Sequence, residues 1–291
     1  MKTTKTRRIR KCGIVAKFGG TSLATAQNIK RVINIIKADR QRRIIVVSAP
    51  GKRFADDIKI TDLLLKIYEL RIQSKPYYDE YILFATRFLE IARMFKLDAK
   101  IAPSLAEFYN QIPFMMIDEI TSRGEYFMAK LMAEILNFEF VDIEKTRVLQ
   151  YKSNTPDYNG FEIDMVASHK NLIKFLGSNI VVPGFYAVTP SGRIRTFSRG
   201  GSDITGAIMA NMAHASVYEN WTDVDGIYTA DPNKVKAAKV IESLTYDEAE
   251  EIMNAGAQVL HHDVFKFVSN KKIPIYVRNT FNPLAQGTRI N

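Results

Sequence analysis

A chain of 291 residues with 46% hydrophobic residues is long enough for one large α/β domain or two small ones, with ample apolar content for a core. It contains no apolar run that could span a bilayer and no secretory signal, so we expect a soluble, cytoplasmic protein without a membrane partner. Residues 1–11 form a basic tail, and without its six basic residues the formal charge of +10 falls to +4. No RNA-binding motif or zinc spacing accompanies the tail, so no nucleic-acid partner is expected.

Short apolar runs alternate with helical patterns along the chain. The first helix is predicted from Ala24 to Ala38, with Thr21 or Ser22 as its cap. A long helical region at 62–119 is interpreted as an inserted helical hairpin over the edge of a sheet, and a β-hairpin is predicted around 189–193. Such alternation predicts a largely parallel sheet with helices on both faces. The strands are predicted at 12–18, 44–48, 138–143, 179–183, 216–221 and 273–277.

The stretch KFGGTS, Lys17 to Ser22, joins the first predicted strand to the first predicted helix. It lacks the lysine after the loop that defines a P-loop, and it lacks the third glycine of a dinucleotide fingerprint. Its two adjacent glycines let an anion approach the backbone closely, and the start of the helix and Lys17 both add positive charge there. The interpretation is an anion-binding turn.

Four further polar clusters stand at strand ends or helix starts, where α/β folds place their ligands. The first, SAPGK at 48–52, leads to Thr61, the predicted cap of the next helix. The others are SRGE at 122–125, FSRGGSD at 197–203 and WTDVDGIYTADP at 221–232. Two glycine-pair turns, each beside a cationic residue, can cradle a polyphosphate from two sides, which is the arrangement that phosphoryl transfer needs.

These motifs occur in this order over nearly the whole chain. Together with VLH at 259–261 and the closing QGTRI, they resemble the catalytic domain of the aspartokinases, in the amino acid kinase superfamily. The resemblance implies an α/β fold, a three-layer αβα sandwich with a mostly parallel central sheet. In the domain at 12–291, it implies an amino-acid-binding lobe at about 12–185 and an ATP-binding lobe at about 186–291.

The activity that the resemblance implies is ATP-dependent phosphorylation of the side-chain carboxylate of L-aspartate. The product is 4-phospho-L-aspartate, the first step of aspartate-family amino acid biosynthesis, which leads to lysine and threonine. ATP with Mg²⁺ and L-aspartate are the implied ligands, and a homodimer is the implied assembly.

The resemblance also implies roles for individual residues. Lys17, with the amides of Gly19 and Gly20, would neutralise the β- and γ-phosphates, and Asp203 would orient Lys17 or waters of the magnesium ion. Glu125 would bind the α-amino group of aspartate. The implied substrate-binding residues are Thr61, Glu125, Phe185, Arg199 (on the α-carboxylate) and Ser202. The implied ATP-binding residues are Lys17, Phe18, Gly19, Gly20, Ser22, Thr222, Asp223, Tyr228, Asp231, Asn233 and Gln258.

Some features depart from the family or allow other interpretations. Asn233 and Gln258 stand where the family often has basic residues, so weaker ATP binding is expected. The chain stops at Asn291, where aspartokinases commonly continue, so regulatory domains are expected to be absent. His261 and His262 are interpreted as helix surface pointing in different directions, and no metal ligands are predicted. The alternatives left open are a kinase for another small carboxylate, such as glutamate, and a catalytically silent nucleotide or amino acid sensor.

Overall fold

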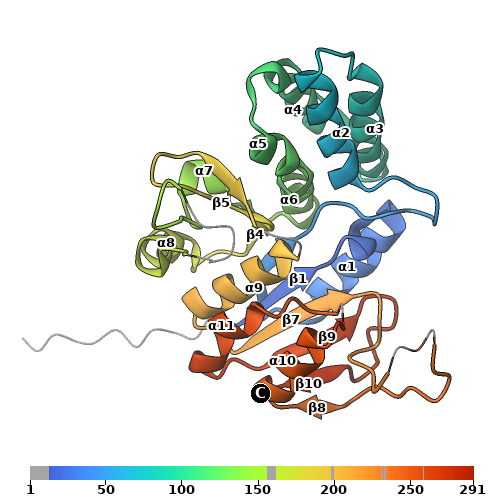
Figure 1. Cartoon of the computed structure of the whole chain (residues 1–291), viewed down its shortest axis with the longest axis vertical. Helices are drawn as coiled ribbons and strands as arrows, with labels where there is room; N and C mark the ends of the chain where they lie inside the picture. The colour runs from blue at the N-terminus through green and yellow to red at the C-terminus, as the bar shows by residue number, and fades with distance from the viewer. Residues whose placement is uncertain (1–12, 156–161, 198–199, 231, 233, 258) are drawn as a thin grey trace, which may run out of the picture.

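An eight-stranded sheet forms the centre of the computed structural model, which describes residues 13–155, 162–197, 200–230, 232, 234–257 and 259–291 (Figure 1). Neighbouring strands pair in parallel except at β9 and β10, so the expected mostly parallel sheet is confirmed. The strand order is β3 (Glu139–Phe140), β4 (Ile180–Pro183), β2 (Arg42–Val47), β1 (Ile14–Phe18), β7 (Val217–Thr222), β9 (Ile275–Asn279), β10 (Thr288–Ile290) and β8 (Ser243–Leu244).

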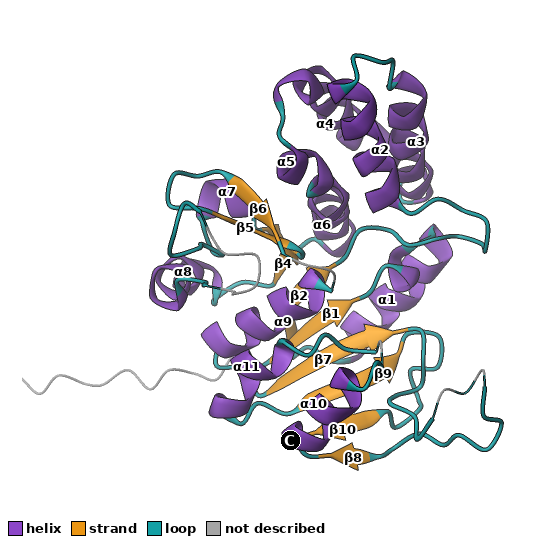
Figure 2. Cartoon of the chain, viewed as in Figure 1, coloured by secondary structure: helices purple, strands orange, loops and turns teal. Residues whose placement is uncertain are grey.

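Helices cover both faces of this sheet, as Figure 2 shows. Alternate side chains of a strand point to opposite faces, so Val15 packs into one core and Ala16 into the other. The first core lies under α8 (Met165–Leu172), α9 (Gly201–Met212), α10 (Tyr246–Asn254) and α11 (Val264–Val268). The second lies under α1 (Ala26–Ala38) and α6 (Arg123–Leu136). The three-layer sandwich is therefore confirmed.

The helical region after β2 differs from the expected hairpin. It contains four helices, α2 (Ile60–Ile72), α3 (Tyr78–Met94), α4 (Asp98–Gln111) and α5 (Ile117–Thr121). They form a cluster that stands beyond α6 at the top of Figure 1, rather than over the edge of the sheet. Ser74 and Lys96 have positive φ angles and break the apolar pattern into separate helices. Phe84, Phe108 and Phe127 pack against one another inside the cluster and attach it to α6.

Two boundaries near the sheet were predicted wrongly. The helix expected from Ala24 begins at Ala26, because Thr21–Leu23 forms a separate 3₁₀ turn. Its cap is Thr25, whose hydroxyl accepts a hydrogen bond of 3.1 Å from the amide of Asn28, and not Thr21 or Ser22. The strand expected at 138–143 is only β3, because Asp142 caps the short helix α7 (Ile143–Thr146).

The predicted β-hairpin is present as β5 (Tyr186–Val188) and β6 (Ile194–Thr196), which pair antiparallel. Gly192 in its turn has a φ of +88°, a conformation that a side chain disfavours. Among the described residues, no helix combines the length and the apolar character that crossing a membrane requires.

Candidate active site

The site lies where the chain leaves the central strand. β1 has β2 on one side and β7 on the other, and ligands of open α/β sheets bind beyond the carboxyl ends of strands at such a point. A cavity of about 660 Å³ opens there. It brings together seven residues that the sequence singled out: Lys17, Gly20, Thr61, Glu125, Phe185, Ser202 and Asp203.

Lys17 is the cation at the base of this cavity. Its side chain is almost buried, and Nζ lies 2.6 Å from Oδ1 of Asp203. Nζ also donates a 3.2 Å hydrogen bond to Oδ1 of Asn220, a buried residue of β7. The side-chain Nδ2 of Asn220 in turn donates to Oδ1 of Asp203 over 3.4 Å. Two partners therefore hold the ammonium of Lys17 in one orientation, which fixes its positive charge near the carboxyl end of β1.

The two glycines after Lys17 differ in role from the expectation. The amide of Gly19 donates to the carbonyl of Trp221 over 3.0 Å, so it is already engaged within the sheet. A Cβ on Gly20 would lie 2.9 Å from the carbonyl oxygen of Ala49 and 3.2 Å from Gly51. Gly20 is therefore required first by the close approach of the 48–51 loop. Of the two, Gly20 lines the cavity, so its amide is the candidate phosphate contact.

Glu125 is the third residue of α6 and directly follows Gly124. A Cβ on Gly124 would lie 2.7 Å from that of Ala49, so this glycine lets α6 approach the site closely. Glu125 is only 6% exposed, and its Oε2 has no hydrogen-bond partner among the described residues. Burial raises the pKa of Glu125 to about 8, against the opposing effect of hydrogen bonds from the amides of Ala49 and Glu125 itself. Glu125 is therefore a buried acid of the site and not a solvated residue at a helix start.

The start of α9 forms the opposite wall. Gly200 has a φ of +84° and precedes the helix, whose first turn carries Ser202 and Asp203. Amide groups at a helix N-terminus carry partial positive charge, which favours an anion in the cavity. The backbone amide of Phe185 donates to the hydroxyl of Thr205 over 3.1 Å, which joins the β4–β5 turn to the same helix.

For several predicted site residues, the structure changes the expected contact or does not describe the residue. The ring of Phe18 is buried against Trp221, with ring centroids 6.0 Å apart, so any nucleotide contact would come from its backbone. The hydroxyl of Ser22 is buried in a 2.7 Å hydrogen bond with Thr280. Thr61 lines the cavity but does not cap α2, since the helix begins at Ile60. Thr222, Asp223 and Tyr228 lie at the end of β7 and in the loop after it. Arg199, Asp231, Asn233 and Gln258 lie outside the described residues.

Two residues of the site, Asn220 and Lys59, were missed by sequence reasoning. Asn220 is a fully buried amide in the strand β7, and a polar residue within a predicted strand was the available signal. Lys59 lines the cavity together with Lys52 of the SAPGK cluster, and both add positive charge to it. No local pattern identifies Lys59, because charged residues are common in exposed loops.

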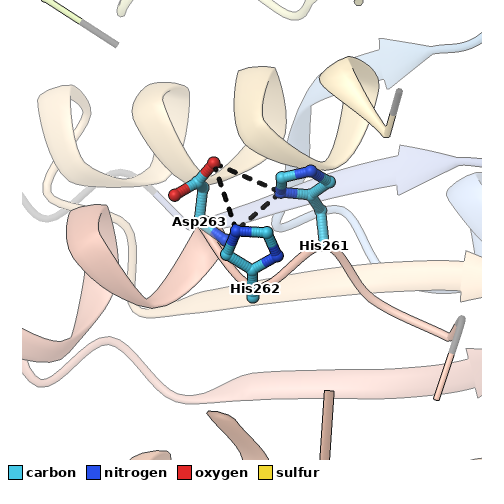
Figure 3. Close-up of side chains that lie close together, drawn as sticks. All are labelled: His261, His262 and Asp263. Atoms are coloured by element: carbon cyan, nitrogen blue, oxygen red, sulfur yellow. Dashed lines mark hydrogen bonds and ion pairs between the residues drawn. The ribbon is translucent and has the colours of Figure 1, made fainter. Parts of the chain in front are cut away.

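A second polar cluster lies before α11 (Figure 3). His261 and His262 are not on a helix, and their rings stack with centroids 4.5 Å apart, so the expectation that they point in different directions is wrong. Possible ligand atoms of the two histidines and Asp263 lie within 4.8 Å of one another. Nδ1 of His261 and the carboxylate of Asp263 are already engaged, because the backbone amide of Asp263 donates to Nδ1 of His261 and the ammonium of Lys266 pairs with Asp263. The amide of His261 donates to Oδ2 of Asp203 over 3.1 Å and thereby supports the active site.

The sheet with helices on both faces and the cavity beyond the carboxyl end of β1 define an α/β protein of the αβα sandwich class with a small-molecule site, and residues 13–279 match the model of the amino acid kinase family. The chain belongs to the amino acid kinase family. It is 36% identical over 287 residues to aspartokinase 3 of Bacillus subtilis, covering 95% of this chain and 63% of that protein.

Solved structures extend this similarity to three dimensions. The aspartate kinase of Clostridium acetobutylicum superimposes with a TM-score of 0.85 at 38% identity, covering 96% of this chain and 62% of that chain. Aspartokinase III of Escherichia coli superimposes with a TM-score of 0.79 at 27% identity, covering 96% and 64%. The expected resemblance to aspartokinases is confirmed, and the chain spans less than two thirds of the length of these relatives.

Proposed function

We propose that this chain catalyses ATP-dependent phosphorylation of the side-chain carboxylate of L-aspartate, the first step of aspartate-family amino acid biosynthesis. The observation that carries the proposal is Glu125, a buried carboxylate in the cavity that also holds Lys17, with one oxygen that has no partner in the described part of the chain. An unsatisfied buried acceptor is costly unless a ligand supplies its donor. The α-ammonium group of a free amino acid is such a donor, whereas a nucleoside monophosphate or an N-acylated substrate lacks it.

The transfer step needs little more than charge and alignment. An oxygen of the aspartate side chain attacks the γ-phosphorus of ATP, the bond from that phosphorus to the bridging oxygen breaks, and ADP leaves. The attacking carboxylate is already ionised at neutral pH, so no strong base is needed. Lys17 lies where it can neutralise charge on the transferring phosphate, and the partial charges at the start of α9 support it.

The described residues also fit the magnesium ion that accompanies ATP. The carboxylate of Asp203 faces the cavity and offers the hard oxygen donors that Mg²⁺ prefers, directly or through water. When bound, the ion would supply positive charge that offsets the charge of the phosphate groups. Asp203 would then hold Lys17 and the ion's ligands in a common orientation.

Relatives support the choice of substrates. Aspartokinase III of Escherichia coli has been solved in complex with aspartate and ADP, and its structure covers 96% of this chain. By similarity, we include ATP with Mg²⁺, a homodimer and a cytoplasmic location in the proposal. The two lobes, with the amino acid on the N-terminal side and ATP on the C-terminal side, belong to it as well.

The proposal is tested by trapping the acyl phosphate with hydroxylamine and measuring the hydroxamate formed from L-aspartate and ATP. Lys17→Ala is the inactivated variant, and Lys37→Ala, on the exposed side of α1, is the matched control. L-Glutamate replaces aspartate in a parallel reaction. We expect product from aspartate with the wild type and with Lys37→Ala, and none with Lys17→Ala.

Two outcomes would contradict this proposal. Product from glutamate in preference to aspartate would assign the site to another carboxylate kinase. Binding of ATP and aspartate by folded protein without any turnover would assign it to a silent sensor.

A further inference from the structure

The loop between β2 and α2 is an irregular wall of the active site. Residues 48–52 and Lys59 line the cavity, yet the loop contains no helix or strand of its own. Positions in such a loop are mobile unless other groups hold them, and misplacement of a reacting group by about 1 Å can cost about a hundredfold in rate. The contacts that hold this loop therefore bear on catalysis.

The start of the loop, at Ser48 to Gly51, packs directly against the turn at Gly19 and Gly20, which we call the phosphate-binding turn. The amide of Gly51 donates to the carbonyl of Gly20 over 2.8 Å, and the amide of Ser48 donates to that of Phe18 over 3.1 Å. A Cβ on Gly51 would lie 2.7 Å from the carbonyl carbon of Gly20. Any displacement of Gly51 is therefore transmitted to Gly20, whose amide is the candidate phosphate contact.

A single arginine from the helical cluster joins both ends of this loop. Arg87 lies on α3, is only 3% exposed, and donates from Nη2 to the carbonyl of Gly51 over 2.5 Å. Its Nη1 donates to Oδ2 of Asp57 over 2.8 Å and to the carbonyl of Ile58 over 3.3 Å. One guanidinium thus fixes the distance between the start and the end of the loop.

Hydrogen bonds from Arg53 hold the carboxylate of Asp57 in the position where it accepts from Arg87. Arg53 donates to it from Nε over 2.9 Å, from Nη2 over 3.0 Å and from its backbone amide over 2.9 Å. The hydrogen bonds from Arg53 and the charge of Arg87 hold the pKa of Asp57 well below its usual range. The carboxylate therefore stays ionised at neutral pH. Its hydrogen bonds with the backbone and side chain of Arg53 join the two ends of the 53–57 segment.

Stability alone is a poor explanation for Arg87. A buried ion pair is often no better than a well-packed apolar residue, and Nε of Arg87 has no partner among the described residues. What an apolar residue would not supply is two donors aimed at fixed points of the active-site loop. These hydrogen bonds fix the positions of Gly51 and Asp57, which packing by an apolar side chain would not do.

We propose that Arg87 and Asp57 are a positioning pair that sets Gly51 against Gly20 and so holds the phosphate-binding turn in its productive place. The helical cluster thereby contributes to catalysis through Arg87, although α3 itself does not line the cavity. This role rests on the proposed kinase function.

The test compares Arg87→Met, which keeps bulk but removes the donors, with Arg93→Met, a matched control on the exposed side of α3. We expect Arg87→Met to raise the KM for ATP about tenfold and to lower kcat roughly 10- to 100-fold. Arg93→Met should leave both unchanged. A loss of folded protein alone would lower kcat without changing KM, so the KM for ATP separates positioning from stability.

Two further measurements keep the test independent of catalysis and of folding. Trypsin should cleave after Lys52 or Arg53 roughly tenfold faster in Arg87→Met than in wild type, because the loop has lost its clamp. Guanidinium ion should partly restore activity to Arg87→Ala by occupying the vacated position. Unchanged cleavage at 52–53 together with a wild-type KM for ATP would overturn the proposal. If the wild type shows no kinase activity, the proposed function fails, and the cleavage rate still decides whether Arg87 holds the loop.

Discussion

Replacement of Glu125 by glutamine tests the physical character of the site most directly. Glutamine keeps the shape of the side chain and removes its ionisation. Burial raises the pKa of Glu125 from 4.5 to about 8 in the folded protein. Because the protonated form is the one that folding favours, its contribution to stability is complete below pH 4.5 and is lost as the pH rises to about 8.

The size of this loss follows from linkage. Each pH unit between the two pKa values changes the free energy of unfolding by about 1.4 kcal/mol, which amounts to about 3 kcal/mol between about pH 5.5 and pH 8.5. The glutamine variant lacks this loss, so its stability relative to wild type should rise by about 3 kcal/mol over that range. Urea unfolding at both pH values measures the difference, and Glu139→Gln on the exposed edge strand is the control.

The same ionisation should control aspartate binding. An ammonium group needs the ionised carboxylate, so wild-type affinity for aspartate should rise about tenfold per pH unit and level off near pH 8. In Glu125→Gln the affinity should be roughly 10- to 100-fold lower above that pH and nearly independent of pH, because a charged hydrogen bond is lost. Titration calorimetry gives both values.

The two results separate the two parts of the reasoning. If stability of the variant and the wild type changes equally with pH, Glu125 titrates normally and the account of its burial is refuted. If stability responds as expected but aspartate affinity does not, the carboxylate is buried for another reason and does not bind the amino group.

Three further substitutions have defined outcomes. Lys17→Met should lower kcat about a thousandfold, since the cation at the transferring phosphate is lost, while aspartate binding by calorimetry stays within about threefold of wild type. Gly20→Ala should lower kcat and raise the KM for ATP, because its Cβ would lie 2.9 Å from the carbonyl oxygen of Ala49, and wild-type kinetics would contradict this. Arg42→Met should destabilise the fold by about 3 to 5 kcal/mol, because it leaves the buried carboxylate of Glu219 without its closest partner, 2.6 Å away. Denaturant unfolding measures this loss, and a change below about 1 kcal/mol would refute it.

Patterns of neighbouring residues were sufficient to predict most strands of the sheet, the first helix and one turn. The strands β1, β2, β4, β7 and β9, the helix α1 after the first of them and the turn at Gly192 were predictable from apolar periodicity and turn residues. The boundaries failed where a short local interaction decided the outcome. Thr25, and not Thr21 or Ser22, caps α1 because a 3₁₀ turn intervenes, and Asp142 starts a helix where an apolar run suggested strand.

The candidate site was predictable where a motif carries its own chemistry. Lys17, Glu125 and Asp203 stand in glycine-containing motifs at strand ends or helix starts, and the structure brings them to one cavity. Asn220 and Arg87 were not predictable in the same way, since an amide in a strand and an arginine in a helix have many ordinary roles. Only their partners reveal what they do.

The sequence by itself determined that this chain alternates strands and helices and that glycine-rich, charged turns stand at the ends of those elements. These properties depend on neighbouring residues, because backbone freedom, helix starts and apolar period are local. Tertiary structure decided which turns meet. Lys17 contacts Asn220 across 203 positions, and Arg87 contacts Gly51 across 36, because a parallel sheet and a helical cluster bring distant segments together. It also decided that Glu125 is buried, and a raised pKa follows from burial and not from the residue type.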